Sequence, residues 1–248
     1  MSSPSARITI LTYHQVGHFG RVRKHRTGFC DCNAFRRQMA FLRAGGYKVL
    51  SLRELVTGLE GRASIPPRAV HLTFDGGTAD FATNAWPVLQ RFEYPASVLL
   101  VSDHIGKNAD WLGRAGLDVV PTLDATSILR LQKEGVRFGS HTRTHGHLIE
   151  LDTARLDDEV TGSRDALRET LGRDVFAFCY PYGEVNRSVL RAVGNAGYRL
   201  GFTCERNRAS RGTHPLLLPR HAISYGTSLL GLYWKLKFQR PGKPLDVT

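Results

Sequence analysis

Three short segments of the chain carry the side chains best suited to chemistry: Thr73–Gly77, Ser140–His145 and Phe178–Gly183. Taken singly, each is weak evidence. Asp-Gly-Gly is more often a simple turn, two histidines four residues apart are often surface residues, and Tyr-Pro-Tyr-Gly is usually a rigid loop. Taken together, they supply a carboxylate, two imidazoles and a shaped loop. That combination suits a hydrolase that activates water with a metal ion.

The two histidines of the second segment are candidate metal ligands. His141 and His145 offer imidazoles of the kind that zinc prefers, and that cobalt or nickel accepts less often. Asp75 offers a carboxylate that could act as the general base on a metal-bound water. Because metal binding lowers the pKa of that water towards neutrality, hydroxide becomes available at physiological pH. We therefore predict a divalent metal site, with zinc as the first choice.

The elements that must position these segments alternate between strands and helices. Each segment follows a predicted strand, at Ala69–Phe74, Val136–Gly139 and Val175–Cys179. At least six strand–helix alternations, with no repeat and no long linker, predict an α/β fold whose parallel sheet is closed or nearly closed by helices. Loops at the carboxyl ends of parallel strands meet at one edge. We therefore expect the three segments to converge within a single domain spanning residues 1–248.

Helix ends can also be predicted locally. Asn33 is a candidate cap for a helix whose apolar face includes Phe35 and Met39, and Gly45 is its expected end. Ser51 with Glu54 has the spacing of a capping box. Residues 107–121 have little periodicity and are predicted to be a loop.

Together, these segments resemble the NodB-type polysaccharide deacetylases, also called carbohydrate esterase family four. Their usual motifs are Thr-Phe-Asp-Asp-Gly, His-Ser/Thr-x-x-x-His and a segment containing Pro-Tyr. The resemblance runs from about Ile10 to about His221, and Leu11-Thr12-Tyr13-His14 is similar to the bacterial exopolysaccharide branch. It implies a distorted (β/α) barrel of seven parallel strands. It also implies an N-acetylglucosamine unit, or less often an O-acetyl ester, as the substrate.

The resemblance also implies roles for particular residues. Asp75 matches the catalytic base, and His141 and His145 match metal ligands. Pro181 and Tyr182 match the substrate groove, where the backbone N–H of Tyr182 would help to hold the tetrahedral oxyanion.

The general acid of the family is a histidine late in the chain. His221 is the best-placed candidate in the sequence, and His14 and His147 are alternatives. A lone histidine is more often structural than catalytic, so this assignment rests on position along the chain alone.

Two positions depart from the family pattern. Gly76 stands where an aspartate should be the third metal ligand. Water could fill that place, another group such as Asp75, Asp80 or His14 could move in, or metal and catalysis could both be lost. Of these we hypothesise weak metal binding. Cys179 stands where an arginine should pair with the catalytic carboxylate, and Arg220 is the candidate substitute in the substrate site.

The function predicted from these residues is a metal-dependent deacetylase. It would hydrolyse the N-acetyl group of an acetylated sugar in a polysaccharide or lipid-linked glycan. One alternative is a catalytically inactive glycan-binding protein of the same fold. Another is a metal-free amidohydrolase acting on a small cyclic amide or imide.

Charge and composition narrow the range of partners. The formal net charge is +12, which favours an anionic glycan, an acidic membrane surface or nucleic acid. No nucleic-acid-binding motif is present, so nucleic acid is not expected. The tail at about residues 227–248 is amphipathic. It predicts either a helix docked on the barrel or a peripheral contact with a membrane. The oligomeric state is left open.

The first apolar run and the cysteine spacing give a prediction of the cellular compartment. The first apolar run, Ile8–Tyr13, is too short for the core of a signal peptide. The four cysteines do not have the spacing of a zinc site and read as free thiols in a reducing compartment. We therefore expect a cytoplasmic location.

Overall fold

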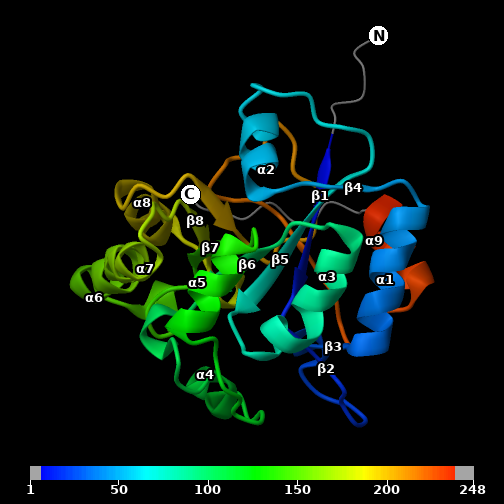
Figure 1. The fold of residues 1–248 in the computed structure, drawn as a ribbon. Coiled ribbons are helices and arrows are strands. Elements are labelled where there is room, and N and C mark those ends of the chain that lie inside the picture. Colours follow the sequence, from blue (N-terminus) through cyan, green and yellow to red (C-terminus); the bar gives the residue numbers. More distant parts are fainter. Residues whose placement is uncertain (1–6, 238–248) are drawn as a thin grey trace.

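The computed structural model describes residues 7–237 and shows a sheet of parallel strands wrapped by helices (Figure 1). The strands follow the order β10-β1-β5-β6-β7-β8-β9, with β4 pairing with β5 beside this path. All pairings in the sheet are parallel. The predicted α/β fold with seven parallel strands in a barrel-like arrangement is therefore confirmed.

The elements have the following bounds. The strands are β1 (Ile8–Tyr13), β2 (Gln15–Gly17), β3 (Phe29–Asp31), β4 (Lys48–Val49), β5 (Ala69–Gly76), β6 (Ser97–Leu100), β7 (Arg137–Ser140), β8 (Ala177–Cys179), β9 (Leu200–Phe202) and β10 (His221–Ala222). The α-helices are α1 (Cys32–Ala44), α2 (Leu52–Leu59), α3 (Trp86–Phe92), α4 (Asp110–Arg114), α5 (Ala125–Lys133), α6 (Thr153–Asp157), α7 (Ser163–Leu171), α8 (Arg187–Asn195) and α9 (Leu229–Lys237). Two π-helical turns, η2 (Phe81–Ala85) and η5 (Asp158–Gly162), precede α3 and α7.

The strand β5 is covered on both faces, as is usual in parallel sheets. All eight residues of β5 are buried. A strand with both faces buried needs apolar layers on each side, and parallel sheets obtain these layers from their crossover helices. β5 pairs with β1 over six residues and continues into the Asp75 segment at its carboxyl end. A fully buried strand of eight residues thus delivers the candidate catalytic residue.

A short segment late in the chain, Leu218–Ala222, nearly closes the barrel. Leu218 pairs in parallel with Phe202 of β9, and the N–H of Thr203 donates to the carbonyl oxygen of Leu218 at 2.9 Å. Three residues later, His221 pairs with Leu11 of β1. The segment Leu218–Ala222 therefore connects the two sides of the sheet, and Arg220 lies in the middle of it.

Two local predictions require correction. The cap of α1 is Asp31 rather than Asn33, because the Asp31 carboxylate accepts the backbone N–H groups of Asn33 and Ala34. The apolar face had suggested a start two residues too late. The region 107–121 contains the short helix α4, whose five residues are too few to show a periodic pattern. The Ser51–Glu54 capping box is present as predicted.

The tail of the chain docks on the barrel where it is described. Leu232 and Leu236 of α9 are buried, α9 contacts α1, and the Gln38 side chain donates to the carbonyl oxygen of Thr227 at 3.2 Å. The two helices lie side by side in Figure 1. The rest of the predicted tail, residues 238–248, lies outside the described residues. Across residues 7–237, no helix is both long and apolar enough to cross a bilayer.

The corrected cap of α1 gives a stability test. Asp31→Ala should lower the free energy of unfolding by about 1 kcal/mol, because two backbone N–H groups lose their acceptor. The exposed Asn33→Ala should change it by less than about 0.5 kcal/mol. Urea denaturation of both variants measures the difference, and a larger loss in Asn33→Ala would restore the cap predicted from the sequence.

Candidate active site

A cavity of about 350 Å³ opens at the carboxyl ends of the strands. It gathers residues from β1, β5, β10 and the loops after β7, β8 and β9, so the predicted convergence of the three segments is observed. Five of the seven predicted site residues line it: Asp75, His141, His145, Tyr182 and Arg220. Its wall also includes His14, Trp111 and Cys204.

The Asp75 carboxylate is held by a buried bidentate ion pair. Arg220 Nη1 lies 2.8 Å from Asp75 Oδ1, and Nη2 lies 2.8 Å from Oδ2. Both residues are almost fully buried, at 1% and 5% exposure. Burial alone would raise the pKa of Asp75, but the charge of Arg220 and its hydrogen bonds outweigh it and hold that pKa well below its usual range. Asp75 is therefore an anion throughout the physiological pH range.

The remaining donors of Arg220 are also satisfied. Its Nη1 lies 3.1 Å from the hydroxyls of Thr12 and Thr73, and its Nε donates to the carbonyl oxygen of Thr203. Its Nη2 is 3.1 Å from Cys179 Sγ. Cys179 carries no positive charge that could pair with Asp75, and Arg220 supplies that charge instead. The pairing predicted from the sequence is therefore present.

The imidazoles of His141 and His145 face each other edge to face, with ring centroids 4.6 Å apart. Nδ1 of His141 lies 2.9 Å from the carbonyl oxygen of Cys179, which fixes the ring and leaves Nε2 directed at the site. Burial lowers the pKa of His141 to about 4, and burial together with His141 holds the pKa of His145 well below its ordinary value. Both rings are therefore neutral at pH 7, which is the form that binds metals.

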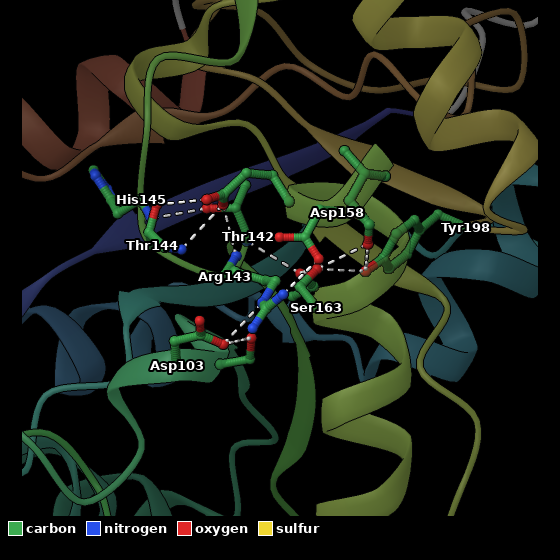
Figure 2. A network of polar contacts seen from close by, with 12 residues as sticks. Asp103, Thr142, Arg143, Thr144, His145, Asp158, Ser163 and Tyr198 are labelled. Atoms are coloured by element: carbon green, nitrogen blue, oxygen red, sulfur yellow. Dashed lines mark hydrogen bonds and ion pairs between the residues drawn. The ribbon is translucent and has the colours of Figure 1, made fainter. Parts of the chain in front are cut away.

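A polar network holds the loop that carries these histidines (Figure 2). The Glu159 carboxylate accepts the backbone N–H groups of Arg143 and Thr144 at 2.9 and 3.0 Å, and also the Thr144 hydroxyl. The Arg143 guanidinium is paired with Asp103 and Asp158. The π-helical turn η5 brings Asp158 and Glu159 to the loop together, an arrangement that recurs near functional sites.

The loop held by this network contains two residues with strained backbone conformations. Thr142 and His145 adopt φ values of 69° and 62°, in the left-handed region that costs side-chain-bearing residues energy. The Thr142 hydroxyl accepts the N–H of His145 at 3.0 Å and locks this turn. The strain sets the direction of the His145 ring.

Gly76 and Trp111 are complementary in shape. Gly76 has a φ of +92°, and a Cβ built on it would lie 3.2 Å from the Trp111 indole. That indole is nearly buried and stacks on His145, with centroids 5.3 Å apart and planes 14° apart. The indole therefore takes up the space into which an aspartate at position 76 would extend. The next residue, Gly77, has a φ of +63°, which favours glycine, and a Cβ on it would lie 2.5 Å from the Leu100 side chain.

The donor set fits a divalent metal only in part. Donor atoms of Asp75, His141 and Cys179 lie within 4.8 Å of one another, but Arg220 already holds both oxygens of Asp75, and a dication there would sit beside its positive charge. His141 and His145 are the better pair. Nδ1 of His145 is a buried polar atom with no partner among the described residues, which is costly unless something binds it. The residues present fit a two-histidine site open to water or substrate.

The third segment forms one rim of the cavity. Tyr182 is 46% exposed and has a φ of 59°. Its ring stacks on His147 at 4.0 Å between centroids and meets His145 edge-on at 5.0 Å. Pro181 is buried behind it and is not part of the cavity wall. His147 in turn pairs with Glu184 at 2.9 Å.

The three histidines considered as general acid lie in different places. His14 lines the cavity, with Nε2 4.0 Å from Asp75 Oδ2. His221 does not line it, although its strand neighbours Arg220 and Ala222 do, as expected if alternate residues of a strand face opposite sides. The role of His221 stays a prediction, and His14 is closer to the chemistry.

Sequence reasoning missed several residues that shape the site. Glu159, Asp103 and Asp158 act on the histidine loop from other elements. The relation of Trp111 to Gly76 depends on a positive φ that no sequence pattern reveals. Only His14 had a signal, in the Tyr13-His14 pair after the first strand.

Comparison with known proteins supplies the decisive observation, since a family model described as polysaccharide deacetylase matches residues 62–201. The chain belongs to the polysaccharide deacetylase family. This is a family of hydrolases that act on carbon–nitrogen amide bonds, and the resemblance inferred from the motifs is confirmed.

The individual relatives of this polysaccharide deacetylase have low sequence identity to it. The chain is 25% identical to YxkH of Bacillus subtilis (strain 168) over 223 residues, covering 90% of this chain and 74% of that protein. It is 26% identical to the poly-beta-1,6-N-acetyl-D-glucosamine N-deacetylase of Staphylococcus epidermidis (strain ATCC 35984), covering 77% of this chain and 66% of that protein. The chain thus spans about two thirds of that staphylococcal relative.

Solved structures of deacetylases share the fold. The Streptococcus pyogenes deacetylase PplD, in complex with acetate, superposes with a TM-score of 0.78 at 24% identity and covers 94% of this chain and 100% of its own. A de-N-acetylase from Aggregatibacter actinomycetemcomitans superposes with a TM-score of 0.80 at 19% identity, covering 92% and 99% of the two chains. At these identities the likeness establishes the barrel and leaves the site to be argued from its own residues.

The Asp75–Arg220 pair gives the second stability test. Arg220→Met should lower the free energy of unfolding by about 3–5 kcal/mol, because it leaves a buried carboxylate without its partner. The double variant Asp75→Leu with Arg220→Met should recover most of this loss, since no uncompensated charge remains. Chemical denaturation measures both, and a single-variant loss below about 1 kcal/mol would contradict the role given to the pair.

Proposed function

We propose that this chain is a divalent-metal-dependent deacetylase, with zinc as the first choice of metal. Its substrate would be the N-acetyl group of an acetylated sugar in a polysaccharide or a lipid-linked glycan. The observation that carries the proposal is the convergence of an arginine-clamped carboxylate and two neutral imidazoles in one cavity. The similarity to the staphylococcal poly-beta-1,6-N-acetyl-D-glucosamine N-deacetylase supports an amino sugar as the substrate.

The residues of the cavity divide the work of amide hydrolysis. A divalent cation held by His141 and His145 would polarise the acetyl carbonyl and lower the pKa of the attacking water. Asp75 would accept a proton from the attacking water. Because the Arg220 clamp makes the Asp75 carboxylate a weak base, a bound metal would be needed to acidify that water. Tyr182 lies at the rim, where its backbone N–H would stabilise the oxyanion.

We assign the proton transfer to the leaving nitrogen to His14. Its Nε2 lies 4.0 Å from Asp75 Oδ2, so a proton accepted by Asp75 can pass through one water to His14 and then to the amine. The net reaction adds hydroxide to the acetyl carbon and a proton to the nitrogen, which yields acetate and a free amino sugar. Trp111 and Tyr182 supply aromatic rings at the cavity wall against which a sugar face can pack.

Acetate release from N-acetylglucosamine oligomers tests this function. The chain should release acetate when zinc or cobalt is added and lose it with a chelator, because the water needs a metal to reach neutral reactivity. His141→Ala should reduce the rate at least about 100-fold. His214→Ala, an exposed histidine outside the cavity, is the matched control and should not. Chelator-insensitive release would favour a metal-free amidohydrolase instead.

Position 76 separates an enzyme from an inactive binding protein. Gly76→Asp should be combined with Trp111→Phe, because the indole lies 3.2 Å from the new Cβ. If the natural chain is an enzyme with weak metal affinity, the double variant should bind zinc more tightly in calorimetry while the unmodified chain already releases acetate. Acetate that appears only in the double variant would favour the inactive glycan-binding protein.

We further propose that α9 attaches the protein to an anionic membrane surface. Four large residues of α9 lie on one helical face and are 37–66% exposed: Leu229, Leu230, Tyr233 and Trp234. The helix carries Lys235 and Lys237, and no acidic residue occurs between Glu205 and Asp246. Exposed apolar side chains flanked by lysines are typical of interfacial helices. The cytoplasmic location predicted from the sequence stays a prediction, and it would bring α9 within reach of the anionic inner leaflet.

The tryptophans provide an internal probe for this contact. Trp86 and Trp111 are 5% and 6% exposed, whereas Trp234 is 52% exposed, so a change in emission on membrane binding should come from Trp234. Anionic phosphatidylglycerol vesicles should shift the emission to shorter wavelength, and phosphatidylcholine vesicles should shift it less. Leu230→Glu should abolish co-sedimentation, while Leu129→Glu, an equally apolar change at a site 38% exposed on α5, should not. Equal sedimentation of both variants would refute the contact.

A further inference from the structure

A second cavity, of about 410 Å³, lies at the opposite end of the barrel. It is formed where β7 begins and just before β8 and β9 begin, against the first residues of α2, which covers this end (Figure 1). Five arginines line it: Arg53, Arg62, Arg137, Arg173 and Arg199. We refer to it as the arginine cavity.

The floor of the arginine cavity is apolar. Leu52, Val56, Phe138 and Leu171 line it and are buried, and Phe176 is half-buried. The Arg199 guanidinium lies over the Phe176 ring, 5.6 Å from its centroid. A charged rim over an apolar and aromatic floor suits a ligand that has one anionic end and one apolar body.

The acidic groups near the rim already have partners. Glu60 is shared by Arg62 and Arg199, the latter at 2.6 Å. Asp174, which is itself one of the lining residues, is 2.7 Å from Arg164, which lies outside the lining. Of the five rim arginines, Arg53, Arg137 and Arg173 have no side-chain hydrogen bond or ion pair with any residue in the described part of the chain.

Helix dipoles account for some of these arginines but not for all. Arg137 and Arg173 follow the carboxyl ends of α5 and α7, where a positive charge is favourable. Arg53 is the second residue of α2, two residues after the cap Ser51, and a cation at a helix N-terminus is unfavourable. The placement of Arg53 therefore opposes local helix stability, and an anion bound in the cavity would offset that cost.

We propose that the arginine cavity binds a small organic phosphate, with the phosphate on Arg53, Arg137 and Arg173 and an apolar or aromatic body on the floor. The planar guanidinium fork matches phosphate oxygens in pairs. A volume of about 410 Å³ lies within the range of small-molecule sites. Such a phosphate could be carried by a soluble nucleotide or by a lipid. The site is separate from the Asp75 cavity and does not depend on the deacetylase function.

Calorimetry on the full chain with four probes tests the proposal. Uridine diphosphate carries an aromatic body, dodecyl phosphate an alkyl body, inorganic pyrophosphate no body, and uridine no phosphate. We expect one of the first two to bind at least about tenfold more tightly than either of the last two, because both the rim and the floor are needed. Preference for uridine diphosphate identifies a soluble source, and preference for dodecyl phosphate identifies a lipid-borne one.

Single-residue variants locate the bound probe. Arg137→Gln and Arg173→Gln should each weaken binding of the preferred probe about tenfold, since each removes a charge-assisted contact. Arg191→Gln, an exposed arginine on α8 outside the cavity lining, removes the same charge and should leave the affinity within about twofold. The proposal is overturned if no phosphate probe binds, if pyrophosphate binds as tightly as the organic phosphates, or if all three variants behave alike.

Discussion

The buried pair of Asp75 and Arg220 is the interaction on which the rest of the site depends. It joins the carboxyl end of β5 to the segment that links β9 with β1, across 145 residues of sequence. Two threonine hydroxyls and a carbonyl oxygen complete the contacts of the guanidinium. A buried ion pair is tolerated only when its hydrogen bonds are satisfied in this way. The pair therefore fixes both the charge of the carboxylate and its direction.

The site has the arginine–carboxylate pair of the family pattern, but its arginine comes from a different part of the chain. In the family pattern the arginine belongs to the third motif, where this chain has Cys179, and here the guanidinium comes from Arg220 instead. Trp111 makes a second exchange, because its indole fills the space next to Gly76 and stacks on His145. Both substitutions preserve packing in the interior. Only at position 76 is the carboxylate of the motif missing, so metal affinity is where this chain should depart most from the pattern that it resembles.

Sequence reasoning reached the barrel and the ionisable centre of the cavity for a definite reason. Strand-end motifs such as Asp75 and His141 are local patterns, and parallel topology brings strand ends together. What it missed arises from geometry between distant segments. Glu159 reaches the histidine loop through a π-helical turn, the strained φ of Thr142 has no sequence signal, and the alternation of β10 turns Arg220 and His221 to different sides. The cap at Asp31 was missed because apolar periodicity locates a helix face better than its first residue.

The segment Leu218–Ala222 has a consequence for how the protein comes into being. This short stretch both bridges β9 to β1 and supplies Arg220. Contacts between residues so far apart in sequence form late in folding, because closing the long intervening loop has a large entropy cost. During synthesis, Asp75 leaves the ribosome well before its partner does, so an unfinished chain holds the motifs without an assembled site. Completion of the fold and creation of the reactive centre are thus the same event.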